Sequence, residues 1–316
     1  MKRIGVLRGG TGDEYFFSLE SGARISEALR KEGYDVLVML VDKEGILHIK
    51  GIPTAPQDIH EHVDAVWNSL HGGIGEDGTI QELFDKLGIA YTGSRPDASR
   101  TAIDKLAAKE RAKQLGIKTP ESILVMPEGG ESIAEITQNI YKRMAPPWVV
   151  KPLKGGASVH TYFAFTPLEL SQFVEESVSH REPFIVEQYI YGKEASVGVI
   201  DNFRGQETYV LPVVELKSTN RGVLTTDART TEDHAVVSGS LRSDEKERLS
   251  KLAKDMHATL GASDYSQSEF IVDKQGKIWY IETDTSPHMH TQSAFVKALH
   301  SVGSSLGEFV RSVLKK

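Results

Sequence analysis

The chain has 316 residues, of which 39% are hydrophobic and 26% charged, so it is long enough for two or three globular domains and is neither disordered nor collagen-like. With 37 Lys and Arg against 44 Asp and Glu, its net charge is -7, which argues against a broad basic surface for nucleic acid. No apolar run approaches the roughly 20 residues of a membrane-spanning helix and no apolar leader opens the chain, so we expect a cytoplasmic protein without membrane contact.

The first third of the chain alternates strand and helix. Residues 2–8 predict a buried strand that runs into a glycine loop, Ser18 can cap the helix that follows, and residues 35–41 predict a second strand. This order is a βαβ unit and indicates a parallel sheet. The elements expected next are a hairpin around 43–45, a strand at 65–70, a helix at 79–87 and a long helix from about 96 to 118.

The rest of the chain predicts shorter elements of α+β type. Strands are expected at 148–152 and 184–190, and a helix at 243–260 and a closing helix from 294 frame a hairpin. The polar stretch 217–239 is weakly periodic and predicts a long loop, of the kind that often closes over a site. We therefore expect domains at 1–97, 98–183 and 184–316.

The expected hairpin carries two carboxylates on one face. A four-residue turn, 273–276, would pair Val272 with Lys277. In that register Glu282 is the diagonal neighbour of Glu269, about 7–8 Å away on the same face of the sheet.

A third carboxylate, Asp284, shares this face if the strand continues. Like charges this close repel each other unless a cation lies among them. Because the chain has no Cys, a metal would need hard oxygen ligands, and these favour Mg²⁺ or Mn²⁺ together with substrate phosphates. The alternative is that Glu269, Glu282 and Asp284 are solvated acids beyond a sheet edge.

A glycine loop after the strand at 148–152 could meet those phosphates. Backbone N–H groups of the loop that contains Ser158 can approach phosphate oxygens, and Lys151 would supply a positive charge. The loop lacks the Walker ending, and a turn between strands explains it equally well. Lys105, inside the expected long helix, is by itself more typical of a solvated surface lysine.

Other candidates are weaker. Glu187 and Glu194 flank an apolar stretch. Its backbone groups could form hydrogen bonds with an adenine edge, and a carboxylate could accept hydrogen bonds from ribose hydroxyls. Solvated surface acids are an equally good explanation of these two residues. The loop at 9–12 lacks the spacing of a dinucleotide fingerprint, which disfavours a nicotinamide cofactor. His288 and His290 fit a substrate-lining or exposed position better than a metal site.

Taken together, these segments resemble an ATP-grasp ligase, and nearly the whole chain is similar to D-alanine–D-alanine ligases. The matching segments include Gly9-Gly10, Ser18-Leu19, His71-Gly72, Gly75-Glu-Asp-Gly-Thr79, Asp104-Lys105, Val150-Lys-Pro152, Gly156-Ala-Ser-Val159 and Glu282-Thr-Asp-Thr-Ser-Pro287. The resemblance implies an ATP-grasp fold, with an N-terminal parallel-sheet domain and two α+β subdomains that enclose ATP.

The resemblance also implies roles for single residues. Lys105 and Lys151 would contact ATP phosphates, and Glu187 and Glu194 the adenine and ribose. Ser158 is also expected to bind ATP. Two Mg²⁺ ions, or Mn²⁺, would bind Glu269, Glu282 and Asp284. Residues expected to contact the amino-acid substrates are Glu14, Phe16, His71 and Ser293, and Lys217 is expected beside the second substrate's carboxylate. The implied reaction passes the γ-phosphate to a carboxylate, and an amine then attacks the acyl phosphate under the loop 217–239.

Several positions depart from the family. Phe16 appears where a glutamate holds the first substrate's ammonium, and Ala157 replaces the serine of the glycine loop. Gln267 and His288 replace the arginine and glycine that stabilise the tetrahedral intermediate. Loss of one such donor costs about 2.7–4 kcal/mol, so we expect His288 or an arginine of the loop 217–239 to compensate.

These departures lead to a functional expectation. We expect an ATP-dependent carboxylate–amine ligase with an altered first substrate, for which a carboxylate without an α-ammonium group is the candidate. The alternative is a catalytically impaired ATP-binding protein on the same scaffold, against which the retained acids argue. The expected partners are small carboxylates and amino acids, and the resemblance suggests a homodimer.

Overall fold

The computed structural model describes residues 2–217, 235–237 and 239–315, and within these ranges the strands form three sheets. The N-terminal sheet has the strand order β4-β3-β2-β1-β5. Its strands are β1 (Arg3–Gly9), β2 (Asp35–Val41), β3 (Leu47–Ile49), β4 (Ile52–Pro53) and β5 (Ala65–Asn68). β1 pairs in parallel with β2 and β5, which confirms the expected parallel sheet, and β2 and β3 form the expected hairpin.

The helices of this region are α1 (Tyr15–Lys31), α2 (Ile59–His62), α3 (Gly73–Glu76) and α4 (Thr79–Leu87), with a 3-10 turn η1 (Pro56–Asp58). The first helix begins before Ser18, which is not its cap. Instead Ser18 Oγ accepts a hydrogen bond from Gly9 N at 2.8 Å and donates to the Ser69 carbonyl at 2.8 Å. Ser18 therefore ties the glycine loop after β1 to the end of β5.

The long helix expected from residue 96 is two helices, α5 (Pro96–Ile103) and α6 (Lys105–Gln114). Asp104 between them has extended backbone, and its carboxylate accepts hydrogen bonds from the backbone N–H groups of Leu106 and Ala107 at 3.0 Å each. Asp is a strong N-cap because its side chain satisfies donors that the first helical turn leaves unpaired. The break therefore puts Lys105 at the first position of a new helix.

The central sheet has the order β6-β9-β7-β8 and is antiparallel. Its elements are β6 (Ser122–Val125), η2 (Pro127–Gly129), α7 (Ile133–Arg143), β7 (Trp148–Pro152), β8 (Tyr162–Ala164), α8 (Pro167–Ser179) and β9 (Phe184–Gln188). The sheet packs with α7 and α8 around its own buried core, which includes Ile140, Trp148 and Val174. Because β9 pairs with β6 and β7, this sheet continues past the domain limit expected at residue 183.

The C-terminal sheet has the order β13-β12-β10-β14-β15, with β11 paired to β10. Its strands are β10 (Gly192–Phe203), β11 (Gln206–Val210), β12 (Val214–Leu216), β13 (Ala235–Val236), β14 (Tyr265–Asp273) and β15 (Ile278–Asp284). The associated helices are α10 (Ser243–Leu260), α11 (Ala294–Ser301) and α12 (Leu306–Val313). The expected closing helix is thus split, at a turn where Gly303 has a φ of 70° that favours glycine.

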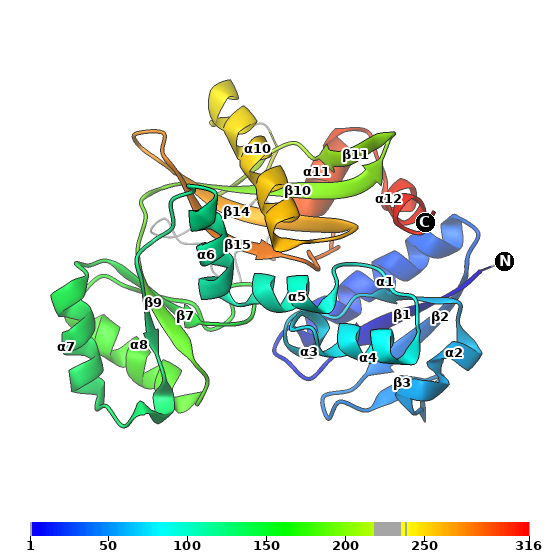
Figure 1. The fold of residues 1–316 in the computed structure, drawn as a ribbon, viewed down its shortest axis with the longest axis horizontal. Helices are drawn as coiled ribbons and strands as arrows, with labels where there is room; N and C mark the ends of the chain where they lie inside the picture. Colours follow the sequence, from blue (N-terminus) through cyan, green and yellow to red (C-terminus); the bar gives the residue numbers. More distant parts are fainter. Residues whose placement is uncertain (1, 218–234, 238, 316) are drawn as a thin grey trace.

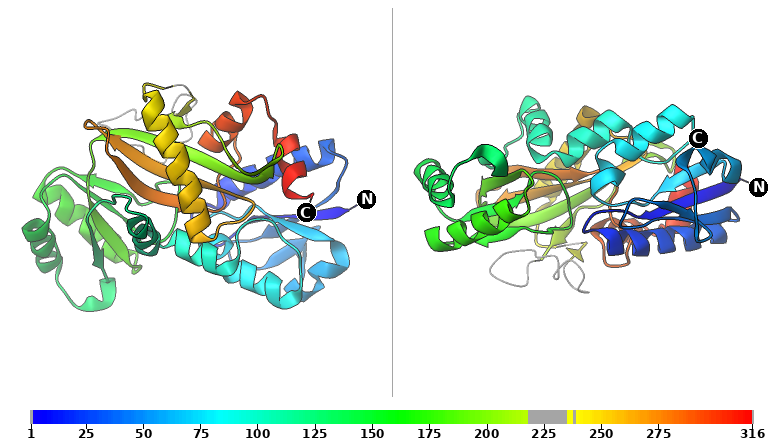
Figure 2. Two further views of the ribbon diagram at one scale, coloured as in Figure 1. Left: turned by 45° about the horizontal axis from the view of Figure 1, so that its top comes forward. Right: turned by 90° about the horizontal axis from the view of Figure 1, so that it is seen from below.

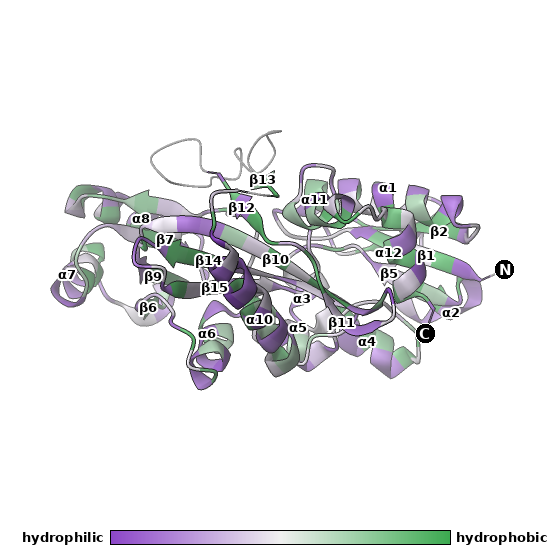
Figure 3. Cartoon of the chain, turned by 90° about the horizontal axis from the view of Figure 1, so that it is seen from above, coloured by the Kyte–Doolittle hydropathy of each residue, from purple (hydrophilic) through white to green (hydrophobic). Residues whose placement is uncertain are grey.

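The three sheets are arranged along the length of the molecule. The N-terminal sheet and the central sheet lie at opposite ends, and β10, β14 and β15 lie between them (Figure 1). The views in Figure 2 show the same elongated arrangement. Hydrophobic residues concentrate in strands such as β7, whereas α7 and α10 carry hydrophilic residues as well, as expected for helices with one solvent-facing side (Figure 3).

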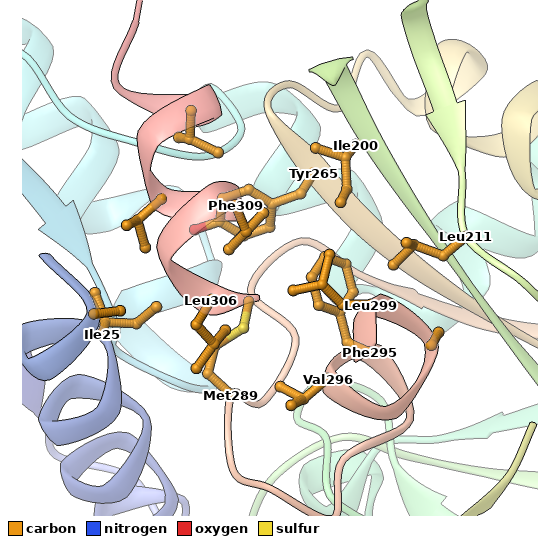
Figure 4. Packing of buried hydrophobic residues seen from close by; sticks show 14 of the residues in the cluster. Ile25, Ile200, Leu211, Tyr265, Met289, Phe295, Val296, Leu299, Leu306 and Phe309 are labelled. Carbon is orange, nitrogen blue, oxygen red and sulfur yellow. The ribbon is translucent and has the colours of Figure 1, made fainter. Parts of the chain in front are cut away.

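One buried core joins the two ends of the chain. It contains Ile25 and Trp67 from the N-terminal region together with Tyr265, Phe295 and Phe309 from the C-terminal region, and Figure 4 shows part of it. The Phe309 ring lies 5.7 Å from that of Trp67 and 5.2 Å from that of Tyr265. The described helices include none that is long and apolar enough to cross a membrane.

Candidate active site

Two adjoining cavities collect most of the residues singled out in the sequence. The first cavity is lined by residues that include Lys105, Lys151, Ser158, Glu187, Glu194, Glu269 and Glu282. The second cavity is lined by residues that include Glu14, Glu76, Gln267, Glu269, Glu282, Asp284, His288, His290 and Ser293. The two cavities share the residues Lys105, Gly155, Gly156, Leu216, Glu269 and Glu282. One lysine and two carboxylates thus lie on the boundary between them.

The hairpin of β14 and β15 places its carboxylates differently from the expected register. Val272 pairs with Ile278 rather than with Lys277, and a β-bulge at Glu269 and Phe270 shifts the pairing beyond it. The bulge makes Glu269 the direct partner of Glu282 instead of its diagonal neighbour. The expected loop length was wrong by one position, but both carboxylates still face the same cavities.

The third carboxylate, Asp284, has other partners. Its Oδ1 accepts a hydrogen bond from Ser286 N at 2.7 Å, and its carboxyl group also shares a hydrogen bond with Glu76. Burial raises the pKa of Asp284 from its ordinary value of 3.8 to about 7, and burial next to Asp284 raises the pKa of Glu76 as well. In the described part of the chain, no three His, Asp or Glu side chains form a ready-made metal site. The three expected ligands therefore line one cavity without converging on a point.

Lys105 is buried rather than solvated. Its side chain crosses to the glycine loop, where Nζ donates to the Gly155 carbonyl at 2.6 Å, and the residue is only 5% exposed. The surface position favoured for Lys105 from sequence alone is therefore wrong. Its place at the start of α6 brings a positive charge to the boundary of the two cavities.

Glu187 lies at the centre of a buried group of charges. Its carboxylate forms ion pairs with Lys109 and, at 3.1 Å, with Lys151 Nζ. Ser122 Oγ also donates to Glu187 at 3.3 Å and accepts from Lys109 Nζ at 3.0 Å. Glu187 is 2% exposed, which excludes the alternative of a surface acid. Glu194, close to the N-terminal end of β10, is partly buried and also lines the first cavity.

Glu14 reaches the second cavity, whereas Phe16 does not. The Glu14 carboxylate accepts a hydrogen bond from Gly156 N at 3.0 Å and lies 3.2 Å from His288 Nε2, and Glu14 is 5% exposed. Phe16 is 70% exposed and packs edge-on against Tyr15. The assignment of Phe16 as a substrate contact is corrected accordingly, because the first turn of α1 directs Phe16 outward. A glutamate does face the second cavity, at position 14.

His288, which lies beside this carboxylate, is close to two further histidines, His71 and His290. The centre of the His288 ring lies 4.3 Å from that of His71, with the two rings tilted by 44°, and 5.9 Å from that of His290. His71 is 4% exposed and bonds Ser21 Oγ through Nε2 at 2.8 Å. Burial, together with repulsion from His288, lowers the pKa of His71 well below its ordinary value, so His71 is neutral near pH 7. His288 and His290 both line the second cavity, as the substrate-lining interpretation predicts.

Of the remaining predicted residues, Gln267 and Ser293 line the second cavity and Lys217 does not. Gln267 lines the second cavity, and its buried Oε1 has no hydrogen-bond partner among the described residues. Ser293 also lines this cavity while its Oγ caps α11. Lys217 is exposed at the end of β12 and lines neither cavity. Most of the expected loop, residues 218–234 and 238, lies outside the described residues.

The sequence analysis did not identify two residues of the site, Lys109 and Glu76. Lys109 follows Lys105 by one helical turn of α6, a spacing that signals a shared helix face. Glu76 belongs to the Gly75-Glu-Asp-Gly-Thr79 segment, yet only the structure brings it to Asp284. A buried lysine or glutamate is recognisable from sequence only when its partner is known.

Two family models match the chain. The D-ala D-ala ligase C-terminus model matches residues 112–315, and the D-ala D-ala ligase N-terminus model matches residues 48–94. The chain belongs to the D-alanine–D-alanine ligase family. It is 32% identical to the D-alanine–D-alanine ligase of Fervidobacterium nodosum, with 99% of this chain and 98% of the relative covered. It is 31% identical to that of Aquifex aeolicus, with 99% of each covered.

Solved structures agree on the fold. The VanG D-Ala:D-Ser ligase from Enterococcus faecalis superposes with a TM-score of 0.83 at 23% identity, covering 99% of this chain and 98% of that one. The D-alanine–D-alanine ligase from Bacillus anthracis in complex with ATP gives 0.79 at 24% identity, covering 100% and 97%. The expected ATP-grasp fold is confirmed, and as a member of this family the chain is an ATP-dependent carbon–nitrogen ligase that uses ATP and Mg²⁺.

Proposed function

We propose that the first cavity binds ATP, that the second binds two amino-acid substrates, and that the phosphoryl group crosses the boundary between them. The observation that carries this proposal is the shared lining of Lys105, Glu269 and Glu282. The oxygen atoms of a transferred phosphoryl group carry negative charge, so catalysis of the transfer depends on neutralising this charge and on positioning the reactants. The boundary offers a buried cation for the phosphate and two carboxylates for metal ions.

The donor set at the boundary fits Mg²⁺. Glu269 and Glu282 are paired across the hairpin and offer only oxygen atoms, and Mg²⁺ is typically held by one or two carboxylates plus substrate phosphates. In our proposal these two residues would hold the metal, with Asp284 at the side of the second cavity. Bound Mg²⁺ would neutralise the phosphate charge that develops during transfer. The Lys105 ammonium, which lines both cavities as well, would add to this.

The second cavity supports an amino acid as the first substrate. The altered-substrate hypothesis rested on Phe16 and Ala157. Ala157 does line this cavity, but Phe16 does not, and Glu14 presents a carboxylate beside the glycine loop. A buried carboxylate favours a cationic partner, and an α-ammonium group is the simplest one. We therefore propose that D-alanine or a related D-amino acid fills this place, with His288 and Ala157 shaping a modified pocket around it.

The reaction in this proposal has two steps. The carboxylate of the first substrate attacks the γ-phosphorus of ATP, which forms an acyl phosphate and releases ADP. The amine of the second substrate then attacks the acyl carbon, the carbon–oxygen bond to phosphate breaks, and the amine loses a proton. The Gln267 amide and the His288 ring line the cavity where the oxyanion would form, and they would donate hydrogen bonds to it.

A substrate panel tests the proposal. Purified protein is assayed for ADP release and, by mass spectrometry, for amide products with D-amino acids, L-amino acids and small carboxylates that lack an ammonium group. We expect turnover with D-alanine or another D-amino acid, and at least a tenfold higher KM for it in Glu14→Gln, while Phe16→Ala stays close to wild type. Turnover only with ammonium-free carboxylates would instead restore the altered-substrate hypothesis. If the protein binds ATP but releases no ADP with any compound of the panel, the result would support the alternative that it is a catalytically impaired ATP-binding protein.

Two further expectations go with this function. A ligase that consumes ATP and free amino acids is expected in the cytoplasm, and the family resemblance suggests a homodimer. Both remain predictions.

A further inference from the structure

Ser21 is a buried serine of α1 that contacts two loops of the active site but lines neither of the two cavities described above. The residue is 1% exposed. Its Oγ lies 2.8 Å from His71 Nε2 and accepts a hydrogen bond from Met289 N at 3.0 Å. His71 lies in the loop after β5 and Met289 in the loop after β15, so one hydroxyl group connects α1 with loops that follow strands of two different sheets.

These hydrogen bonds also determine which ring nitrogen of His71 carries the hydrogen. A serine hydroxyl group has one hydrogen to donate, and a buried one needs an acceptor inside the protein. Because Met289 N already donates to the Ser21 oxygen, His71 Nε2 is the acceptor for that hydrogen among the described residues. Neutral His71 then carries its own hydrogen on Nδ1. The backbone of Ser286 also interacts with the His71 ring, and its carbonyl oxygen can accept this hydrogen.

The groups that Ser21 holds are neighbours of His288. The centre of the His288 ring lies 4.3 Å from that of His71. The residue that follows His288 is Met289, whose N–H group donates to Ser21. The His288 ring also packs against Phe17, one helical turn before Ser21 on α1, with 4.8 Å between the ring centres. The position of the His288 ring therefore depends on contacts that the Ser21 hydroxyl group keeps in place.

We propose that Ser21 is a positioning residue for the ligase reaction: its hydroxyl group holds the His288 ring beside Glu14, in the wall of the substrate cavity. It acts through His71 and through the backbone of Met289. The held geometry is the 3.2 Å distance between His288 Nε2 and Glu14 Oε2. The inference rests on the proposed function, in which the first substrate binds in this cavity.

Two properties separate this role from a contribution to stability alone. A variant that is only less stable contains less active protein, so its kcat falls while both KM values stay unchanged. A displaced His288 ring instead affects the amino-acid cavity and leaves ATP binding in the first cavity as it was. In addition, a residue that acts through His288 has little further effect once that side chain is removed, whereas independent effects add.

The kinetic test measures ADP release with D-alanine, or with another D-amino acid that the wild type turns over, in Ser21→Ala, His288→Ala and the double variant. Displacement of a positioned group by about 1 Å can lower a rate by up to about 100-fold. For Ser21→Ala we expect kcat/KM for the amino acid to fall about tenfold or more, with the KM for ATP within about twofold of wild type. The double variant should be little worse than His288→Ala.

Ser26→Ala is the matched control on the same helix. Ser26 is 2% exposed, and its Oγ donates to the Gly22 carbonyl at 2.7 Å, within α1. The variant therefore also removes a buried hydroxyl group and its hydrogen bond, but it changes no contact with the loops of the site. We expect its kcat/KM and both KM values to stay close to those of wild type.

Nuclear magnetic resonance of the histidine ring nitrogens in wild-type protein tests the arrangement directly. The signals of His71 are identified by their absence from the spectrum of His71→Gln. We expect the tautomer with the hydrogen on Nδ1 near pH 7. A hydrogen on Nε2 would overturn the inference, because Ser21 could not then donate to that nitrogen.

Two kinetic outcomes would also overturn the inference. One is a Ser21→Ala variant with the kcat/KM of wild type, and the other is a loss that is equally large with and without the His288 side chain. If Ser21→Ala does not fold, the tautomer of His71 in wild-type protein decides. Wild-type protein that releases ADP with no amino acid would instead refute the proposed function, so the two failures are distinguishable.

Discussion

Among single residues, Glu76 and Asp284 form the most strongly perturbed carboxyl pair in the second cavity. Burial raises both pKa values, with that of Asp284 near 7. A carboxyl group whose pKa is higher in the folded than in the unfolded protein binds protons more tightly when folded. The pair therefore contributes less to the free energy of unfolding as the pH rises from about 4 to 7.

This pH dependence gives a prediction for Asp284→Asn. The amide cannot ionise but keeps nearly the same shape, so the variant escapes the cost of burying a second negative charge beside Glu76. In metal-free buffer we expect its stability relative to wild type to increase from pH 5 to pH 8, measured as the difference in free energy of unfolding by urea at each pH. A difference that is constant across this range would show that Asp284 does not titrate there.

Glu14 illustrates what a single residue can decide about function. Position 16 looks like the place of the family glutamate when residues are matched along the sequence, but position 14 faces the cavity. An offset of two residues at the start of a helix changes which side chain points inward, because successive residues are turned by about 100° around the helix axis. The position of the helix start thus decides which of the two side chains lines the second cavity.

At the scale of elements, the break between α5 and α6 positions the boundary lysine. Asp104 caps α6, and the following residue, Lys105, reaches the Gly155 carbonyl. A continuous helix would keep the chain in helical conformation through residue 104 and would direct Lys105 elsewhere. The cap therefore has a consequence for the site as well as for the helix.

Removing this cap should affect both stability and activity. We expect Asp104→Ala to lose about 1 kcal/mol of stability and to raise the KM for ATP, because Lys105 loses its fixed position. Ser132→Ala is the matched control, since Ser132 caps α7 at the far end of the central sheet and should cost similar stability without a change in KM (Figure 1). Urea unfolding and ADP release measure the two effects. Equal KM values for both variants would contradict a positioning role for the cap.

At the scale of the whole molecule, the buried cores do not correspond one to one to the three domains expected from the sequence. The N-terminal and C-terminal regions share one core, in which Phe309 contacts Trp67 and Tyr265, whereas the central sheet has a core of its own. The packing thus joins the first and last parts of the chain. The described residues of the central core are thus separate from those of the core shared by the two ends of the chain.

Hydrogen exchange read by mass spectrometry can test this division. We expect Phe309→Ala, at a cost of about 3–5 kcal/mol, to increase exchange in both the N-terminal and C-terminal sheets but not in the central sheet. Ile140→Ala, which empties part of the central core, should increase exchange within the central sheet alone, at a cost of about 2–5 kcal/mol. If Phe309→Ala affects only the C-terminal sheet, the shared core does not act as a cooperative unit.

The sequence by itself determined the βαβ start, the helices at 79–87 and 243–260, the hairpin with its acids, and the family. These features depend on local periodicity, turn residues and short motifs, which are written in neighbouring positions. Ordered motifs also identified charged and polar residues that line the two cavities. The residues found in this way include Lys151, Ser158, Glu187, Glu269 and Glu282.

Only the tertiary structure decided the contacts between distant segments. The bulge that sets Glu269 opposite Glu282, the burial of Lys105 and Lys109, and the inward position of Glu14 all depend on neighbours that are far away in sequence. A side chain's charge state and direction follow from what surrounds it, and that environment exists only once the sheets have packed together.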